Sequence, residues 1–391
     1  MRAEIDPQHP FIQVVTSGGS GCRFYRSSMP AFTLNWFEGL GVHCIEVPSP
    51  LMEPGILGAT RSVVLKSPQG FMALELVKQL YAAKQRFPAL NLVADFDDIV
   101  YHVDPKEGDY DFSPFGPQDP IALEKRKEQD AYTIEMLKLL DRVVVTNEYS
   151  KRQLEKLGLT NIVVVPNAVP RSMWNTPRRK PLEKDLAKPR VVLTQCPQHY
   201  RPGGRAPDGK EIPEELGDLK SAEWREWLIK NVKDDKISLV QLGGPSFAWN
   251  EIQNKVESYP WVTPNRYASL VCRQNMDLTL APLVPSEIAR NKSDLRYVEA
   301  AVCSAAFLGS DFEDSPYSRC PDIAKVPLGY TMDQLDERLR QICDRETYNG
   351  IVEKNWEFLL KEGRIMESEQ YVGRLMDAWC GESKAIAFDL I

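Results

Sequence analysis

Two acids and a histidine follow an apolar stretch in the first half of the chain. Asp97 and Asp98 follow residues 92–95 after one intervening residue, Phe96, and His102 lies four residues beyond Asp98. A carboxylate beside an imidazole can transfer protons. Asp95 and Asp97 have an Asp-x-Asp spacing, which can bind a divalent metal. Asp97, Asp98 and His102 are therefore candidate catalytic residues. The alternative is a helix cap with solvated acids.

A second group lies in the segment 280–301. Its pattern predicts a strand that ends at a proline, then a loop, then a helix that begins near Ser293. Lys292, beside the positive end of that helix, suits a pyrophosphate. Glu299 lies about two turns inside the helix. If buried, its carboxylate can accept hydrogen bonds from ribose hydroxyls; if exposed, it is an ordinary surface residue, and spacing alone does not decide.

Two glycine-rich stretches were compared with phosphate-binding motifs. Gly18, Gly19, Ser20 and Gly21 directly follow the first predicted strand, where backbone amides can approach a phosphate or an acceptor. They do not form a dinucleotide fingerprint, because Phe24 stands where its third glycine is required. The stretch 204–211 ends in a glutamate where a P-loop needs a hydroxyl, so the sequence argues against a nucleoside triphosphatase.

The elements that must position these residues alternate between short β-branched runs and amphipathic stretches, a pattern typical of parallel α/β sheets. Strands are predicted over 11–16, 42–47, 62–66, 92–95, 142–146, 162–166, 190–194, 237–243, 261–263, 277–282 and 305–310. Helices are predicted over 30–40, 71–87, 121–140, 223–232, 268–273, 294–302, 332–345 and 348–379. Because ligands of such sheets bind at the carboxyl ends of the strands, the candidate residues are well placed.

The pattern breaks over 170–189, where prolines and bases without periodicity indicate a linker. We therefore predict two Rossmann-like domains, 1–180 and 181–365, that face a central cleft. The last residues, 366–391, are predicted to form a helix and tail that can return to the first domain.

Composition excludes several classes of protein. The 391 residues are 43% hydrophobic and 26% charged, as in ordinary globular proteins, and no low-complexity tract or repeat is evident. No apolar run could cross a bilayer, and the first residues do not form a signal peptide. The eight cysteines include no CxxC pair, which indicates reduced thiols and a cytoplasmic location. The net charge of −7 gives no general attraction for nucleic acid.

Several segments together resemble the GT-B glycosyltransferases of the retaining, glycogen-synthase-like group. The resemblance covers roughly residues 10–380 and is carried by 143–150, by 163–169 and by the motif that joins Asn291, Lys292 and Ser293 to Glu299. The opening 21–30 and the acidic turn at 95–98 are similar to the versions found in bacteria and tailed phages, and a phage protein would act in the host cytoplasm.

The resemblance implies transfer of a sugar, a hexose or a pentose, from a nucleotide-diphosphate sugar to an acceptor hydroxyl. The second domain would hold the donor, most simply a UDP-sugar. Glu299 would bind the ribose, Lys292 and Arg201 would neutralise the diphosphate without an essential metal, and His199 would lie in the donor site. Replacing Glu299 with Ala is expected to weaken donor binding and to leave the fold intact.

One departure from the family affects the stereochemistry. The family has a pair of acids at a fixed spacing, and counting back from Glu299 places the first of them at Asn291, which is neutral. Asn291 can bind sugar hydroxyls but supplies no charge. Retention is therefore the favoured course rather than a required one.

The first domain of such enzymes selects the acceptor, so the residues expected on that side are Gly18, Gly19, Ser20, Gly21, Arg26, Asp97, Asp98 and His102. Asp97 or Asp98 would orient or deprotonate the attacking hydroxyl. The acceptor is either a surface glycan or lipid-linked saccharide, or a hydroxymethylated pyrimidine in phage DNA. DNA would need a basic groove, for which the candidates are Arg178, Arg179, Lys180, Lys184, Lys188, Arg190, Arg201 and Arg205.

Two other functions stay open. A sugar-nucleotide 2-epimerase has the same two-domain architecture, but it needs acid/base groups around the donor sugar, and the second domain offers few. A catalytically silent module that binds sugar nucleotides or glycans would be consistent with a neutral Asn291.

Overall fold

The computed structural model describes residues 11–16, 23–37, 40, 42–98, 120–194, 204–205, 211–212, 217–244 and 247–381. The chain forms two compact units. The first contains Met1–Pro170, Arg290–Ser293 and Glu362–Ile391, and the second contains Arg171–Ala289 and Asp294–Lys361. A short piece of the second half of the sequence, Arg290–Ser293, thus belongs to the first unit.

The first unit is built on a six-stranded parallel sheet in the order β2-β1-β3-β4-β5-β6. Its strands are β1 (Phe11–Val15), β2 (His43–Val47), β3 (Thr60–Lys66), β4 (Asn91–Asp95), β5 (Arg142–Val145) and β6 (Ile162–Val164). Residues such as Val63, Val93 and Val143 are fully buried, because helices cover both faces of a parallel sheet.

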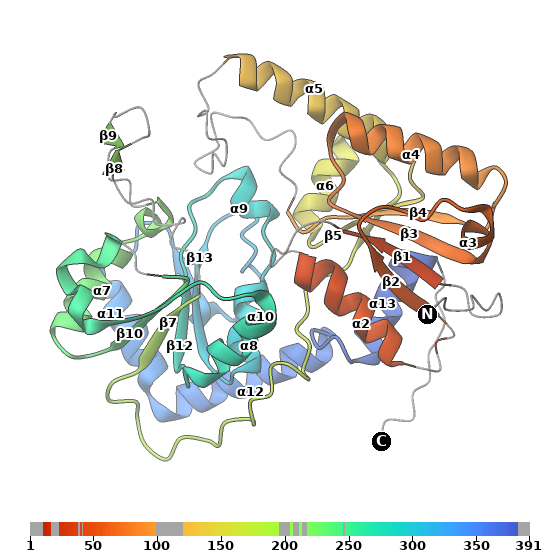
Figure 1. Cartoon of the computed structure of the whole chain (residues 1–391). Helices are drawn as coiled ribbons and strands as arrows, with labels where there is room; N and C mark the ends of the chain where they lie inside the picture. Colours follow the sequence, from red (N-terminus) through yellow and green to blue (C-terminus); the bar gives the residue numbers. More distant parts are fainter. Residues whose placement is uncertain are drawn as a thin grey trace. The chain divides into compact units, whose positions relative to one another are not determined.

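Figure 1 shows α4 (Gly70–Lys84) and α5 (Pro120–Leu137) on one face of this sheet, and α2 (Met29–Trp36) and α13 (Glu369–Cys380) on the other. Apolar residues of α4, α5 and α6 (Glu148–Lys156) form one core with the strands. On the opposite face the main-chain carbonyl of Trp379 accepts a hydrogen bond of 2.6 Å from Ser62 Oγ of β3. The C-terminal helix is therefore part of the first unit.

The second unit contains another six-stranded parallel sheet, in the order β11-β10-β7-β12-β13-β14. Its strands are β7 (Arg190–Leu193), β10 (Ser238–Leu242), β11 (Val256–Tyr259), β12 (Leu278–Ala281), β13 (Ala306–Asp311) and β14 (Lys325–Pro327). Counted along the chain within this sheet, the order is 3-2-1-4-5-6, that of the dinucleotide-binding fold. In that order the topological switch point, outside which ligands bind, lies between β7 and β12.

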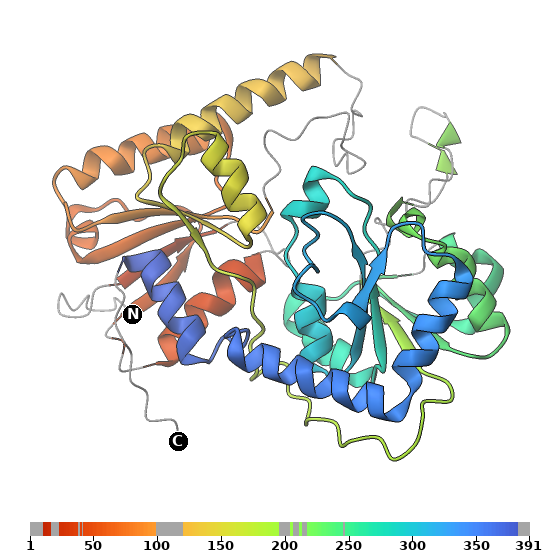
Figure 2. The same cartoon turned by 180° about the vertical axis from the view of Figure 1, so that it is seen from behind.

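Helices cover both faces of the second sheet as well. Figure 1 shows α7 (Trp224–Lys233) and α11 (Met332–Cys343) on one side and α8 (Pro264–Arg273) and α10 (Leu295–Val302) on the other. The long α12 (Arg345–Lys361) is seen from behind in Figure 2 and shares a core with α7 and α11. Two short antiparallel strands, β8 (Gly204–Arg205) and β9 (Glu211–Ile212), form a separate pair.

Two predicted elements are wrong. The strand expected over 261–263 is irregular, and β11 ends instead at Tyr259 because Pro260 cannot donate to the sheet; Trp261 beyond it is 69% exposed. The helix expected over 348–379 is two helices, since α12 stops before Gly363, whose φ of +57° is one that glycine adopts most readily. The other predicted strands are present within two residues, while α6, α9 (Glu287–Asn291) and β14 were not predicted.

Candidate active site

The end of β4 carries a buried ion pair between Asp95 and Arg26. Arg26 lies in a short π-helix, Phe24–Ser28, and its Nε donates to Asp95 Oδ1 at 2.7 Å, with the two side chains 2% and 1% exposed. Trp379 Nε1 donates to the other carboxylate oxygen at 3.1 Å. Burial opposes the charge of Arg26, but Asp95 and other neighbours hold its pKa above the usual value. The guanidinium that was expected on the acceptor side thus lies within the interior of the first unit.

Asn167, which lies just after β6, links Asp97 to the ion pair of Arg26 and Asp95. Asn167 Nδ2 donates to Asp97 Oδ1 at 2.8 Å and to Ser293 Oγ at 2.9 Å. Its Oδ1 accepts from Arg26 Nη1 at 3.3 Å. A predicted catalytic acid and a predicted donor-binding serine therefore share one buried amide.

Asp98 pairs with Lys292. Lys292 Nζ lies 3.6 Å from Asp98 Oδ2, and the two side chains are 21% and 29% exposed. Burial raises the pKa of Asp98, and the neighbouring Asp97 raises it further, while the positive charges of Lys292 and Lys66 oppose the shift without cancelling it. A predicted catalytic acid and the predicted diphosphate ligand are thus in direct electrostatic contact.

The segment Arg290–Ser293 is held by the loop between β5 and α6. Asn147 Nδ2 lies 3.2, 3.1 and 2.8 Å from the carbonyl oxygens of Arg290, Asn291 and Lys292, and its Oδ1 caps α6. Ser150 Oγ donates to Asn291 Oδ1 at 2.8 Å, and Asn291 is 3% exposed. These bonds satisfy carbonyls at the C-terminal end of α9, where a helix has no further N–H groups of its own to offer.

In the second unit Glu299 is buried, which excludes the surface role. It lies in α10, is 1% exposed, and its Oε2 accepts from Arg296 Nη1 at 2.8 Å and from the Tyr267 hydroxyl at 3.2 Å. Burial opposes the charge of Arg296, yet Glu299 holds its pKa well above the usual value, whereas burial raises the pKa of Tyr267. α10 follows β12, one of the two strands at the switch point, after the short α9.

Seven of the predicted site residues lie outside the described part of the chain: Gly18, Gly19, Ser20, Gly21, His102, His199 and Arg201. Among the described ones, the structure brings Arg26, Asp97, Asp98, Asn291, Lys292 and Ser293 into the first unit and Glu299 into the second.

Four of the bases predicted to form a DNA groove are engaged within the second unit. Arg178 pairs with Glu353 and Lys188 with Asp235. Arg179 Nη1 lies 2.6 Å from Asp277 Oδ1. Arg190 forms a bidentate pair with Glu257, with both nitrogen–oxygen distances 2.7 Å. These contacts explain the basic linker as part of the fold and weaken the case for a DNA groove.

Four amide and hydroxyl side chains support the candidate site without having been assigned a role from the sequence: Asn147, Ser150, Asn167 and Tyr267. A signal existed for two of them, because Asn147 and Asn167 come directly after predicted strands, at the edge where ligands bind.

Within the described residues, no three or more His, Cys, Asp or Glu are grouped as metal ligands would be. No helix in the described part has the length and hydropathy needed to cross a bilayer.

Comparison with known proteins supports the fold. No family model matches the chain, and no curated protein matches its sequence. A glycosyltransferase from Rickettsia africae ESF-5 superposes with a TM-score of 0.56 at 13% identity, over 93% of this chain and 96% of that one. HepE from Anabaena in complex with UDP-glucose gives a TM-score of 0.50 at 11% identity, over 90% and 95%. The chain also matches TarM, with a TM-score of 0.48 at 14% identity over 88% of its residues, but spans only 58% of that protein.

The chain therefore has the GT-B fold of these structures, with two Rossmann-like α/β units. The predicted fold class and the resemblance in architecture are confirmed.

Proposed function

We propose that this protein is a glycosyltransferase that moves a sugar from a UDP-sugar to an acceptor hydroxyl. The observation that carries the proposal is the buried Glu299, on the helix that follows a switch-point strand of a sheet with the dinucleotide-binding order. Burying a carboxylate is costly unless it has partners, and here Arg296 and Tyr267 keep it in place. HepE, which has the same fold, binds UDP-glucose.

The proposed roles follow from the residue chemistry. Glu299 accepts hydrogen bonds from the ribose of the donor, and Lys292 neutralises the diphosphate as it leaves. Asp97 or Asp98 orients and deprotonates the attacking hydroxyl. The reaction needs no metal if Lys292 supplies the charge, and retention is its favoured course.

A glycan or a lipid-linked saccharide is the better acceptor candidate. Four of the eight bases proposed for a DNA groove are used in ion pairs of the second unit.

The first test is binding and turnover by the full chain. UDP-sugars are expected to raise the melting temperature selectively over GDP-, ADP- and dTDP-sugars, because a ligand that binds only the folded state stabilises it by mass action. Slow release of UDP in the absence of acceptor, unchanged by EDTA, would support a metal-independent transferase. Release of a 2-epimer would instead identify an epimerase, and binding without any turnover would identify a silent module.

A further inference from the structure

Asn167 was given no role from the sequence, but the structure places it between several residues of the candidate site. It is 1% exposed, and it joins the buried pair of Arg26 and Asp95 to the predicted site residues Asp97 and Ser293. Its main-chain oxygen also accepts a bond of 2.6 Å from Arg364 Nη1. Both its backbone and its side chain are therefore fixed.

The geometry of a planar amide makes this link specific. A side-chain amide carries two N–H donors on one nitrogen, and in Asn167 one goes to Asp97 Oδ1 at 2.8 Å and the other to Ser293 Oγ at 2.9 Å. Rotation of the amide is opposed by Arg26, which donates to its oxygen at 3.3 Å. Arg26 is itself held by Asp95 and by the carbonyl of Val165 at 2.6 Å.

A positioned base has to be held by groups that do not themselves move. A displacement of about 1 Å of a reacting group can cost about 100-fold in rate. The main-chain oxygen of Asp97 accepts from Thr146 Oγ1 at 3.0 Å, so its backbone is held after the strand ends, and the position of its carboxylate is set by side-chain partners. Asn167 supplies such a partner from a neighbouring loop.

We infer that Asn167 is a positioning residue, which holds the Asp97 carboxylate and the Ser293 hydroxyl in one fixed arrangement for sugar transfer. This inference rests on the proposed function, since it concerns the base and the donor segment of that site. Asn167 does not contact the reacting atoms in this role.

Two substitutions distinguish the bond from Asn167 to Asp97 from the bond to Ser293. Asn167→Asp keeps the shape and an acceptor for Arg26, and the Ser293 hydroxyl can donate to the new carboxylate. Only the bond to Asp97 is lost, and it is replaced by repulsion between two carboxylates. Asn167→Ala removes both bonds.

The test measures UDP release from the UDP-sugar that stabilises the wild-type protein. For Asn167→Asp we expect kcat to fall about 100-fold with a donor KM close to that of the wild type. For Asn167→Ala we expect a similar fall in kcat together with a raised donor KM, because Ser293 is released as well. Melting temperatures are measured for both variants so that rates refer to folded protein.

The matched control is Asn161, in the same unit, whose Nδ2 donates at 2.6 Å to the main-chain oxygen of Leu140. Asn161→Asp and Asn161→Ala are expected to change stability but neither kcat nor KM. Wild-type kcat in Asn167→Asp, or equal losses in the Asn161 variants, would overturn the inference while leaving the proposed function intact. A wild-type protein that neither binds nor turns over a UDP-sugar would overturn the proposed function and this role with it.

Discussion

The contact between Asp98 and Lys292 leads to a quantitative prediction: replacing Asp98 with Asn should tighten the binding of UDP. In the proposed reaction Lys292 has to serve the diphosphate, yet here its ammonium group lies 3.6 Å from the Asp98 carboxylate. A diphosphate must therefore compete with Asp98 for Lys292. Asn is nearly isosteric with Asp and removes only the competing charge.

The distance sets the size of the effect. Two unit charges 3.6 Å apart attract by about 1 kcal/mol in bulk water and by about 5 kcal/mol at an effective dielectric constant of ~20. Both side chains are partly exposed, at 21% and 29%, and measured energies of exposed pairs lie toward the lower value. We therefore expect a gain of about 1.4 kcal/mol, which is about tenfold in Kd.

The assay is calorimetric titration of UDP into the wild-type protein and Asp98→Asn. Glu75→Gln is the control, because it also removes an acid paired with a lysine in the first unit. In a Lys292→Met background the benefit of Asp98→Asn should largely disappear, since a double-mutant cycle isolates the pair. Equal or weaker UDP binding by Asp98→Asn, or the same gain without the lysine, would refute the competition.

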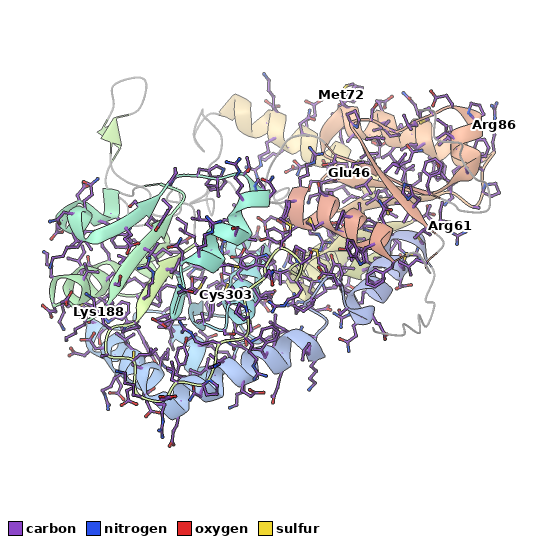
Figure 3. The ribbon with its side chains drawn as sticks, turned by 60° about the horizontal axis from the view of Figure 1, so that its bottom comes forward. Glu46, Arg61, Met72, Arg86, Lys188 and Cys303 are labelled. Carbon is purple, nitrogen blue, oxygen red and sulfur yellow. The ribbon has the colours of Figure 1, made fainter. Side chains whose placement is uncertain are left out.

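Three further predictions concern other parts of the chain. Glu299→Gln should weaken UDP binding with a small change in melting temperature, because its amide oxygen can still accept from Arg296 and Tyr267. Glu299→Ala should also destabilise the fold, because it removes the acceptor for both donors. Equal melting temperatures for the two variants would contradict this. Cys272 should be the first described cysteine alkylated by iodoacetamide near neutral pH, because a hydrogen bond with Cys303 lowers its pKa against the effect of burial. Cys303 is labelled in Figure 3. Peptide mass spectrometry would show whether another described thiol reacts sooner. Gly309→Ala should lower the melting temperature, since an added Cβ would lie 2.6 Å from ring atoms of Phe307 and Tyr317, while Gly350→Ala, with open space around it, should be neutral or stabilising; a harmless Gly309→Ala would show that the rings can move.

The prediction for Glu299 corrects one expectation from the sequence. Helical spacing predicted a residue that tolerates alanine, because periodicity does not show what lies across from a helix. Arg296 is one turn away and was visible in the sequence, but the hydroxyl of Tyr267 comes from α8, and only tertiary structure brings it to the carboxylate. Burial makes Gln the informative substitution.

Most of the fold was predictable because both sheets are parallel and buried. A strand that is covered on both faces, such as 143–145, has an unbroken run of β-branched residues in its sequence. The edge strand β11 was misplaced, since Val256–Tyr259 is only partly buried and carries polar residues. The break before α13 was missed because both helices are amphipathic and the deciding feature is the backbone at Gly363.

The charged residues of the candidate site were identifiable from the sequence, whereas the side chains that contact them were not. Lys292, Asp97 and Asp98 were identified by type and by position after strands. Their pairing, and the role of Asn167, depend on contacts between residues far apart in the chain, such as the 126 positions that separate Asn167 from Ser293. The place of Asn167 directly after a predicted strand puts it at the edge where ligands bind, but it does not show which groups the amide contacts.

The neutral residue at Asn291 has a structural explanation that bears on mechanism. Its Oδ1 accepts from Ser150 Oγ at 2.8 Å, and the side chain is 3% exposed, so the fold already uses it to hold Arg290–Ser293 in the first unit. A carboxylate there would be buried beside the Ser150 hydroxyl, and burying a charge is costly unless it is paired. The neutral amide at this position therefore fits the packing around it. In the proposed reaction the electrostatic work falls instead to Lys292, Asp97 and Asp98, which is why their mutual contacts should control donor affinity and rate.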